Sequence, residues 1–456
     1  MIYEEAIVKY KRTSCTIAIL TALILFGLSP TVGAEDEKAL SLEERIKNLE
    51  QLSDELLHHE LAEHDLEDQQ QKRKAQAAGL RYGGSGGLIY ARPGYSNPRA
   101  VIGGYMDLEY ANLEGPTNAR RNPNSSFDQT RFVPFIYSDV TENTRMAAEL
   151  EVEHGIGEAE LEFAVIDHSF AEWINFRAGV ILLPVGKFNL VHDSPINDLT
   201  QRPEVTLRVI PGVLREPGVG VFGTFYPTQL SKLDYEVYVT QGMNGFSKDG
   251  TSRITDASGL AGARWQTTDV GLNLDNNNNQ AVTSRLAYSP LLGVEIGASG
   301  YHAKIDPESK RPLTIGALDW TFMRGPWEFL GEAAYTTIED NDKDLDGRYI
   351  GLPERMFGWY GQLNYHFMPT LIQQLAPKYF TNDSIFTAVL RVDDVNTNLD
   401  VPGLEGDVFR ITPGINFRPT EDTAFKFEYQ YNFEPNRITG RDVMNDGIIL
   451  SVATYF

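Results

Sequence analysis

Hydrophobic and polar residues alternate with a period of two through most of the chain beyond residue 100. In the first such stretch, Met106, Leu108 and Tyr110 alternate with Asp107 and Glu109. The same alternation returns in residues 148–153, 158–163, 233–239, 327–335, 357–367 and 425–431. Successive side chains of a β-strand point to opposite faces, so this pattern predicts strands with one apolar and one polar face.

The chain ends in a further strand of the same kind, residues 446–456 (DGIILSVATYF). Its alternating positions are Ile448, Leu450 and Val452 on one face and Ile449, Ser451 and Ala453 on the other, and its last residue is Phe456. A tilted strand of about 9–11 residues crosses a bilayer when its neighbours close a barrel and satisfy its backbone. A terminal Phe in such a strand resembles the closing strand of bacterial outer-membrane barrels.

Sixteen strands of this kind fit between residues 100 and 456. Long connections alternate with short ones, apart from a tight turn near Gly155 and the segment 368–383, which we interpret as a short periplasmic helix. Segregation of loop lengths to the two ends is typical of outer-membrane barrels. The sequence therefore predicts an all-β fold, a 16-stranded antiparallel transmembrane β-barrel with apolar side chains toward lipid and a polar, wet lumen.

The first 99 residues differ from the barrel region. Residues 1–34 combine basic residues, an apolar stretch and the sequence Val32-Gly33-Ala34, which predicts a signal peptide. Residues 35–78 predict a periplasmic α-helix, in which leucines at 42, 49 and 56 indicate a short coiled coil; a single solvated helix is the alternative. Residues 79–99 form a Gly- and Pro-rich linker, and residues 100–456 form the outer-membrane barrel.

The amino-acid composition limits what the protein can bind and how it can be stabilised. The net charge of −23 at pH 7 argues against nucleic acid, and the apolar strand faces require outer-membrane lipid. The one cysteine, Cys15, lies in the predicted signal peptide, so a closed hydrogen-bonded barrel has to stabilise the remaining chain without disulfides. The 5 Trp, 21 Tyr and 23 Phe suit aromatic girdles at two membrane interfaces.

Two stretches carry a resemblance to a known family. Gly103-Gly104-Tyr105 looks like the start of bacterial porins, and residues 176–220 (FRAGVILLPVGKFNLVHDSPINDLTQRPEVTLRVIPGVLREPGVG) resemble relatives of the phosphate-selective porin (O and P type) family. The resemblance implies a passive channel, usually a homotrimer, whose third loop folds inward. Those phosphate channels line their pores with Arg and Lys, whereas the lumen expected here is rich in Glu, so phosphate selectivity does not carry over.

The expected constriction is the long connection 185–217, which four prolines stiffen. Long loops without repeats are usually functional, and the alternative is a loop that lies over the barrel mouth. The span also contains Glu204, and the candidate constriction residues are eight of its polar and charged members: Lys187, His192, Asp193, Asp198, Arg202, Arg208, Arg215 and Glu216.

The polar strand faces supply candidate pore-lining residues. Acids cluster on two adjacent strands, where Ala159, Leu161 and Phe163 are assigned to the lipid face, and bases cluster near the C-terminus. The candidates are Glu149, Glu151, Glu153, Glu158, Glu160, Glu162, Arg391, Arg410, Arg418 and Lys426. Over all polar faces sixteen acids oppose seven bases, which predicts a modest cation preference that weakens as salt rises.

Two patterns point to other chemistry. Asp342, Asp344 and Asp346 have the opening spacing of a calcium loop, although Pro353 stands where a closing acid is needed; a solvated acidic loop is the alternative. His192 and Ser194 have the spacing of outer-membrane phospholipases, but they sit in a loop rather than on a rigid strand. We expect no enzyme activity and no cofactor except a structural calcium ion.

The leading hypothesis is an outer-membrane porin that passes small hydrophilic solutes and ions by diffusion. One alternative is an anion-selective channel of the phosphate type. Another is a structural tether with a sealed barrel, in which the N-terminal helix engages the cell wall or a neighbour. Conductance separates a channel from a sealed tether.

Overall fold

A computed structural model of the whole chain describes residues 100–114, 125–155, 157–247, 251–263, 279–339, 352–381, 383–400, 406–434, 442–443 and 445–456. By its internal contacts the chain divides into residues 1–76 and 77–456, and every described residue belongs to the second unit. The predicted signal peptide, N-terminal helix and linker lie outside the described residues, as do the three aspartates of the predicted calcium loop.

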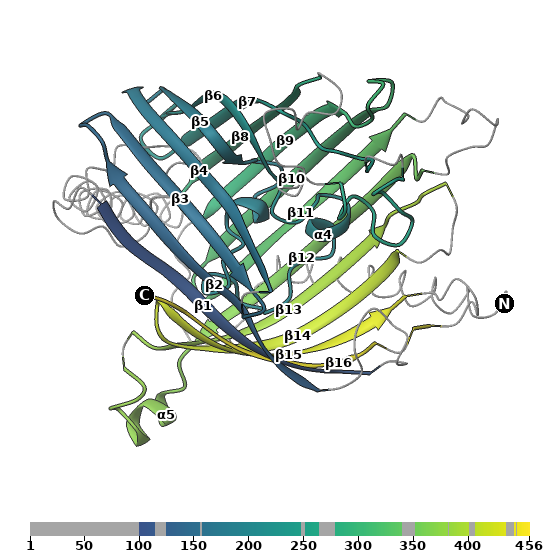
Figure 1. Cartoon of the computed structure of the whole chain (residues 1–456). Coiled ribbons are helices and arrows are strands. Elements are labelled where there is room, and N and C mark those ends of the chain that lie inside the picture. Colours follow the sequence, from purple (N-terminus) through teal and green to yellow (C-terminus); the bar gives the residue numbers. More distant parts are fainter. Residues whose placement is uncertain are drawn as a thin grey trace, which may run out of the picture. The chain divides into compact units, whose positions relative to one another are not determined.

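Sixteen antiparallel strands form one closed barrel, which confirms the predicted fold class (Figure 1). The first eight are β1 (Ala100–Leu113), β2 (Ser126–Asp139), β3 (Thr144–Glu153), β4 (Glu158–Ala171), β5 (Ile174–Leu182), β6 (Arg215–Phe225), β7 (Lys232–Thr240) and β8 (Ala281–Leu291). The second eight are β9 (Val294–Lys304), β10 (Pro312–Arg324), β11 (Trp327–Ile338), β12 (Arg355–Phe367), β13 (Ile385–Asn396), β14 (Asp407–Thr420), β15 (Thr423–Phe433) and β16 (Gly447–Tyr455).

The barrel closes between β1 and β16, where Tyr105 lies opposite Tyr455. Beyond this ladder the two backbones of Gly104 and Phe456 exchange hydrogen bonds of 3.1 and 2.9 Å, and the Phe456 ring stacks on Phe132 with centroids 5.7 Å apart. A Cβ on Gly104 would lie 2.8 Å from the Phe456 ring, so glycine is required for this close approach. Closure gives each of the sixteen described strands a neighbour on both sides, as a membrane barrel requires.

Connection lengths separate the two ends of the barrel. Short connections lie at one end, residues 140–143, 172–173, 226–231, 292–293, 325–326 and 421–422, together with the longer 368–384. The last contains α5 (Thr370–Leu375), which confirms the helix predicted there. Longer connections, with the tight turn 154–157, lie at the other end. Among the described residues no helix has both the length and the apolar character needed to cross a membrane.

Side chains alternate between the two faces of the barrel wall largely as predicted. On β1, Asp107 is 1% exposed, whereas its neighbours Met106 and Leu108 are 39% and 37% exposed on the outer face. The assignment of Phe163 to the lipid face is wrong. A register shift between β3 and β4 next to Glu149 makes Phe163 face inward, where it is buried. A β-bulge of this kind reverses the side-chain phase beyond it.

The interior is less polar than a uniformly wet lumen would be. The connection between β5 and β6, residues 183–214, contains η1 (Phe188–Leu190) and α4 (Val205–Arg208). Its apolar residues pack with inward-facing side chains of β10 to β13 into one buried cluster, which includes Leu183, Val205, Ile210, Ile315 and Tyr360. The prediction of a wholly polar interior is therefore wrong for this part of the wall, because loop residues supply the apolar contacts there.

Candidate functional site

The connection 183–214, called the inner loop from here on, lies within the ring of strands. α4 contacts β11, β12 and β13, and Figure 1 shows it among the barrel strands. Inner-loop residues also bond to inward-facing side chains of β1, β4, β9, β10, β14, β15 and β16. The inner loop thus reaches opposite parts of the wall.

Glycine permits the first turn of the inner loop. Gly186 has a φ of +72°, a conformation that residues with a Cβ rarely adopt. A Cβ at this position would overlap the carboxylate of Glu332 on β11. The Gly186 N–H donates to Ser299 Oγ on β9 at 2.9 Å, so the turn sits directly against the wall.

Three wall carboxylates accept backbone N–H groups of the inner loop. They belong to Glu332, Asp393 and Glu428, on β11, β13 and β15, and all three are completely buried. The bonds run from Phe188 N to Glu332 Oε2 at 3.1 Å, from Glu204 N to Asp393 Oδ1 at 3.0 Å, and from Thr200 N to Glu428 Oε2 at 2.6 Å. Each bond gives a loop N–H an acceptor on the buried side of the wall, and an amide left without one would lose stability, so these acids anchor the loop backbone.

Wall bases anchor the same loop through its oxygen atoms. The four basic candidates on β13 to β15 all donate to it. Arg391 Nη1 donates to Gln201 O at 2.7 Å, Arg410 Nη2 pairs with Glu204 Oε1 at 2.5 Å, Arg418 Nη2 donates to Ile196 O at 2.9 Å, and Lys426 Nζ donates to Ser194 O at 2.5 Å. These side chains are covered by the loop, and Arg391, Arg410 and Lys426 are buried.

The charged residues of the inner loop reach several strands. Lys187 Nζ lies 3.0 Å from both Glu295 Oε1 on β9 and Thr321 Oγ1 on β10. Asp198 accepts bonds from Asn364 at 2.7 Å and Asn416 at 2.9 Å, on β12 and β14. Each contact ties the loop to a different part of the wall.

The second half of the inner loop carries Arg202 and Arg208. Arg202 lies near enough to Glu151 and Glu162 for electrostatic attraction. Arg208 Nε bonds to Glu204 Oε2 at 2.7 Å, and its Nη1 lies 3.8 Å from Glu434. Burial alone lowers the pKa of Arg208, but these two carboxylates raise it above its ordinary value, so the guanidinium stays charged.

Arg215 and Glu216 lie on β6 rather than in a loop, because the strand begins at Arg215. Arg215 pairs with Glu160 on β4. Glu216 accepts hydrogen bonds from Tyr301 Oη at 2.7 Å, Thr240 Oγ1 at 2.6 Å and Gly242 N at 2.9 Å, and it is completely buried. Its role in this structure is to satisfy those donors.

His192 and Ser194 do not form a hydrolytic pair. His192 Nδ1 contacts Asn189 O at 2.9 Å, and its Nε2 pairs with Glu162 on β4. Ser194 Oγ instead donates to Asp107 on β1. Asp193, between them, accepts a bond of 2.9 Å from Tyr455 Oη. General-base activation requires the His to reach the Ser hydroxyl, and here each has another partner.

One base on β2 faces four acids. Arg131 lies within 4.0 Å of carboxylates on β1 and β3: Asp107 at 3.3 Å, Glu109 at 3.9 Å, Glu151 at 3.1 Å and Glu153 at 3.3 Å. Its side chain is 13% exposed, and that of Glu153 is 23% exposed. This group, the Arg131 cluster, therefore carries more negative than positive charge and keeps contact with solvent.

The other acidic candidates differ in exposure. Glu149 and Glu162 are each 1% exposed, and Glu162 pairs with His192 of the inner loop. Glu160 has a side chain that is 27% exposed, and Glu158, opposite Glu153 in the strand register, is also exposed. Glu153, Glu158 and Glu160 thus offer charge to solvent near the end of β3 and the start of β4.

Sequence reasoning did not identify the anchoring role of Glu332, Asp393 and Glu428. The period-two pattern places all three on the inward face, which is the available signal. Their partners are backbone N–H groups more than a hundred residues away, and no local pattern specifies such contacts.

Within the described part of the chain, no group of three or more His, Cys, Asp or Glu side chains has a metal-binding arrangement.

No protein-family profile matches this chain. An uncharacterized protein of Aquifex aeolicus (strain VF5) is 26% identical over 362 residues, which cover 72% of this chain and 74% of that protein. Its description assigns no activity, so the similarity adds no functional information.

Solved structures of outer-membrane channels resemble the barrel. The anion-selective porin from Comamonas acidovorans has a TM-score of 0.50 and 10% identity, covering 78% of this chain and 99% of that porin. The outer membrane channel DcaP of Acinetobacter baumannii has a TM-score of 0.49 and 10% identity, covering 78% and 97%. The resemblance to the phosphate-selective family stays a prediction. The chain thus has the closed 16-strand barrel architecture of outer-membrane porins.

Proposed function

We propose that the protein is an outer-membrane channel for passive diffusion of small hydrophilic solutes and ions, and that the inner loop is its constriction. The observation that carries this proposal is the anchoring of the loop inside a closed barrel by wall acids and wall bases. A loop held at many points keeps a fixed cross-section, which passive selection by size requires. Anchoring also explains why so many charged side chains face inward.

A modest cation preference follows from the Arg131 cluster. Four carboxylates surround one guanidinium there, and solvent reaches the group. Acids in a low-dielectric passage raise the local concentration of cations. The effect weakens as the Debye length falls from about 10 Å at 0.1 M salt to about 3 Å at 1 M.

Planar-bilayer recording of the purified full chain tests both parts of the proposal. We expect stable conductance steps, and a reversal potential of cation-selective sign across a potassium chloride gradient. Protein boiled before addition is the control for unfolded or contaminating material. An anion-selective reversal potential would contradict the charge argument and favour the phosphate-type alternative.

A sealed barrel is the second candidate, and the buried apolar cluster favours it. Leu183, Val205 and Ile315 belong to a cluster that fills part of the interior with protein. A barrel plugged in this way would serve as a structural tether. Absence of any conductance from protein that shows the heat-modifiable gel mobility of a folded barrel would support the tether and exclude the channel.

We further propose that the barrel assembles as a homotrimer, since porin-like barrels associate through their apolar outer faces. Light scattering of the detergent-solubilised chain should give three times the protomer mass. A protomer mass would contradict this proposal without affecting the channel.

A further inference from the structure

The connection between β12 and β13 is longer than a strand reversal requires. Residues 368–384 stand at the end of the barrel where most described connections contain two to six residues. Two residues suffice to reverse neighbouring strands. The additional residues include α5, which begins after Pro369 and ends before Pro377, so proline limits the helix at both ends.

The segment exposes large apolar side chains. Leu371, Leu375 and Tyr379 are 65%, 76% and 68% exposed. Leu371 and Leu375 stand one turn apart and therefore share one face of α5. Exposure of this kind in water calls for an apolar partner.

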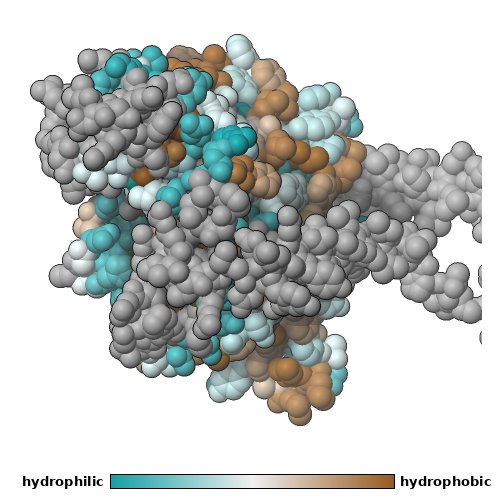
Figure 2. Space-filling model, turned by 90° about the vertical axis from the view of Figure 1, so that its right-hand side faces the viewer, coloured by the Kyte–Doolittle hydropathy of each residue, from teal (hydrophilic) through white to brown (hydrophobic). Residues whose placement is uncertain are grey.

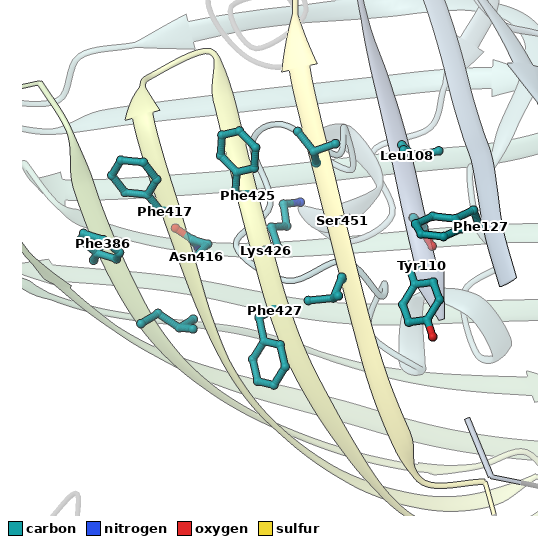
Figure 3. Close-up of a pocket in the computed structure, with 14 residues that line it drawn as sticks. Leu108, Tyr110, Phe127, Phe386, Asn416, Phe417, Phe425, Lys426, Phe427 and Ser451 are labelled. Atoms are coloured by element: carbon teal, nitrogen blue, oxygen red, sulfur yellow. The ribbon is translucent and has the colours of Figure 1, made fainter. Parts of the chain in front are cut away.

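Phe380 joins the segment to the outer face of the barrel. Its ring lies 5.2 Å from the Phe417 ring and 6.2 Å from the Phe386 ring, measured between centroids. Phe386, Phe417 and Phe425 project from neighbouring strands on the outer side, as Figure 3 shows, with Lys426 pointing inward. The segment is thus continuous with a surface that faces lipid.

These rings are part of an aromatic row near the short-connection end. Neighbouring centroids are 4.5 to 6.5 Å apart along Trp327, Tyr365, Phe367, Phe386, Phe417 and Phe425, on β11 to β15. Aromatic girdles mark the level at which acyl chains meet headgroups. Phe380 therefore places the segment at one membrane interface.

Shape and charge agree with this location. α5 is the lowest described element in Figure 1 and projects away from the barrel, and the lowest part of the space-filling view in Figure 2 is mostly hydrophobic. The helix itself contains no charged residue. Lys378 follows it, is exposed, and has its Nζ 5.9 Å from the Tyr379 ring centroid. A lysine next to an aromatic ring at this level can reach a lipid phosphate.

We propose that residues 370–380 bind the bilayer interface beside the barrel. Leu371, Leu375 and Tyr379 enter the acyl region of a phospholipid leaflet, and the Lys378 ammonium contacts headgroup phosphate. The occupant is phospholipid rather than protein, because the segment extends the lipid-facing aromatic row. This role is independent of channel activity.

Spin labels test the proposal in the full chain, with Cys15→Ser as background and single Leu371→Cys or Leu375→Cys changes. The protein is reconstituted in vesicles of phosphatidylethanolamine and phosphatidylglycerol. We expect a several-fold higher ratio of oxygen to nickel-chelate accessibility at these sites than for Glu308→Cys, an exposed position in the connection between β9 and β10. Gln373→Cys, two residues from each leucine and therefore on the opposite face of α5, should give an intermediate ratio.

Two outcomes would overturn the proposal. Ratios at Leu371 and Leu375 equal to that at Glu308 would show that the segment stands in water. Labels shielded from oxygen and nickel alike would show that protein covers the segment. Lys378→Gln should lower the ratio at Leu375 in these vesicles but leave it unchanged in neutral detergent, which separates the headgroup contact from apolar insertion. Heat-modifiable gel mobility verifies that each variant is folded.

Discussion

The backbone N–H of Thr200 in the inner loop donates a hydrogen bond of 2.6 Å to Glu428 Oε2 on β15. Gln201 N–H adds a longer bond of 3.4 Å to the other oxygen, and Gln430 Nε2 donates to that oxygen at 3.0 Å. Both carboxylate oxygens of Glu428 therefore hold the backbone of the inner loop. An acidic side chain that faces inward is thus not by itself evidence of contact with permeating ions.

Replacement of Glu428 should loosen this part of the loop. Glu428→Ala leaves the partly buried Thr200 N–H without its acceptor, which costs about 1–3 kcal/mol. We expect amide exchange of residues 196–204 to accelerate by about tenfold or more, measured by mass spectrometry. Glu421→Ala, in an exposed turn at the end of β14, is the control and should leave exchange unchanged. Equal protection in both variants would contradict the anchoring role.

Removal of the charge of Arg131 should increase cation preference. Arg131→Gln leaves four carboxylates without their shared cation. The reversal potential across a potassium chloride gradient should shift in the cation-selective direction, and the shift should shrink at 1 M salt as the Debye length falls to about 3 Å. Arg324→Gln, exposed on β10 at the short-connection end, should cause no shift. Identical potentials in the two variants would show that the cluster does not face the ion path.

The glycine at the first turn of the inner loop should resist substitution. Gly186→Ala forces a Cβ into a φ of +72° and against Glu332. The left-handed conformation alone costs roughly 1–2 kcal/mol for a residue with a Cβ. We expect a lower urea midpoint for unfolding from vesicles. Gly316→Ala on β10, where a Cβ meets nothing within 4 Å, is the matched control and should be nearly neutral. Similar midpoints for both variants would contradict the predicted strain.

One exposed turn should respond to pH. His154, between β3 and β4, lies 2.6 Å from Asp128 Oδ2 on β2. Slight burial lowers the pKa of His154, but the hydrogen bond and charge of Asp128 outweigh it, so the pKa is raised above 6.5. Because the folded pKa is the higher one, the pair stabilises the turn below about pH 6.5 and loses this effect as pH rises through the raised value.

A titration of the His154 ring by NMR measures this directly. Asp128→Asn should lower the pKa of His154 toward its ordinary value. Glu158→Gln, which removes a weaker charge effect, should lower it less. An unchanged pKa in Asp128→Asn would show that the two side chains do not interact in solution.

The predicted loop residues show how far sequence reasoning reaches into the site. The length and proline content of the region after β5 indicate a functional loop, and Lys187, His192 and Asp198 do contact the wall. Their partners, Glu295, Glu162 and Arg418, could not be paired with them from sequence. Such pairing depends on the path of the loop across the barrel, which tertiary contacts determine.

By itself the sequence determined the strands, their number, and for most strand residues whether the side chain points to lipid or into the barrel. The reason is that backbone geometry and the need to present apolar side chains to lipid impose period-two alternation locally. It did not determine the inward turn of Phe163, which depends on a bulge in the pairing of β3 with β4. Nor did it determine that Glu332, Asp393 and Glu428 hold the inner loop, or that Phe380 joins the aromatic row. These features arise only when closure brings distant residues together, because a buried hydrogen bond or ring contact is specified by position in space rather than by spacing along the chain.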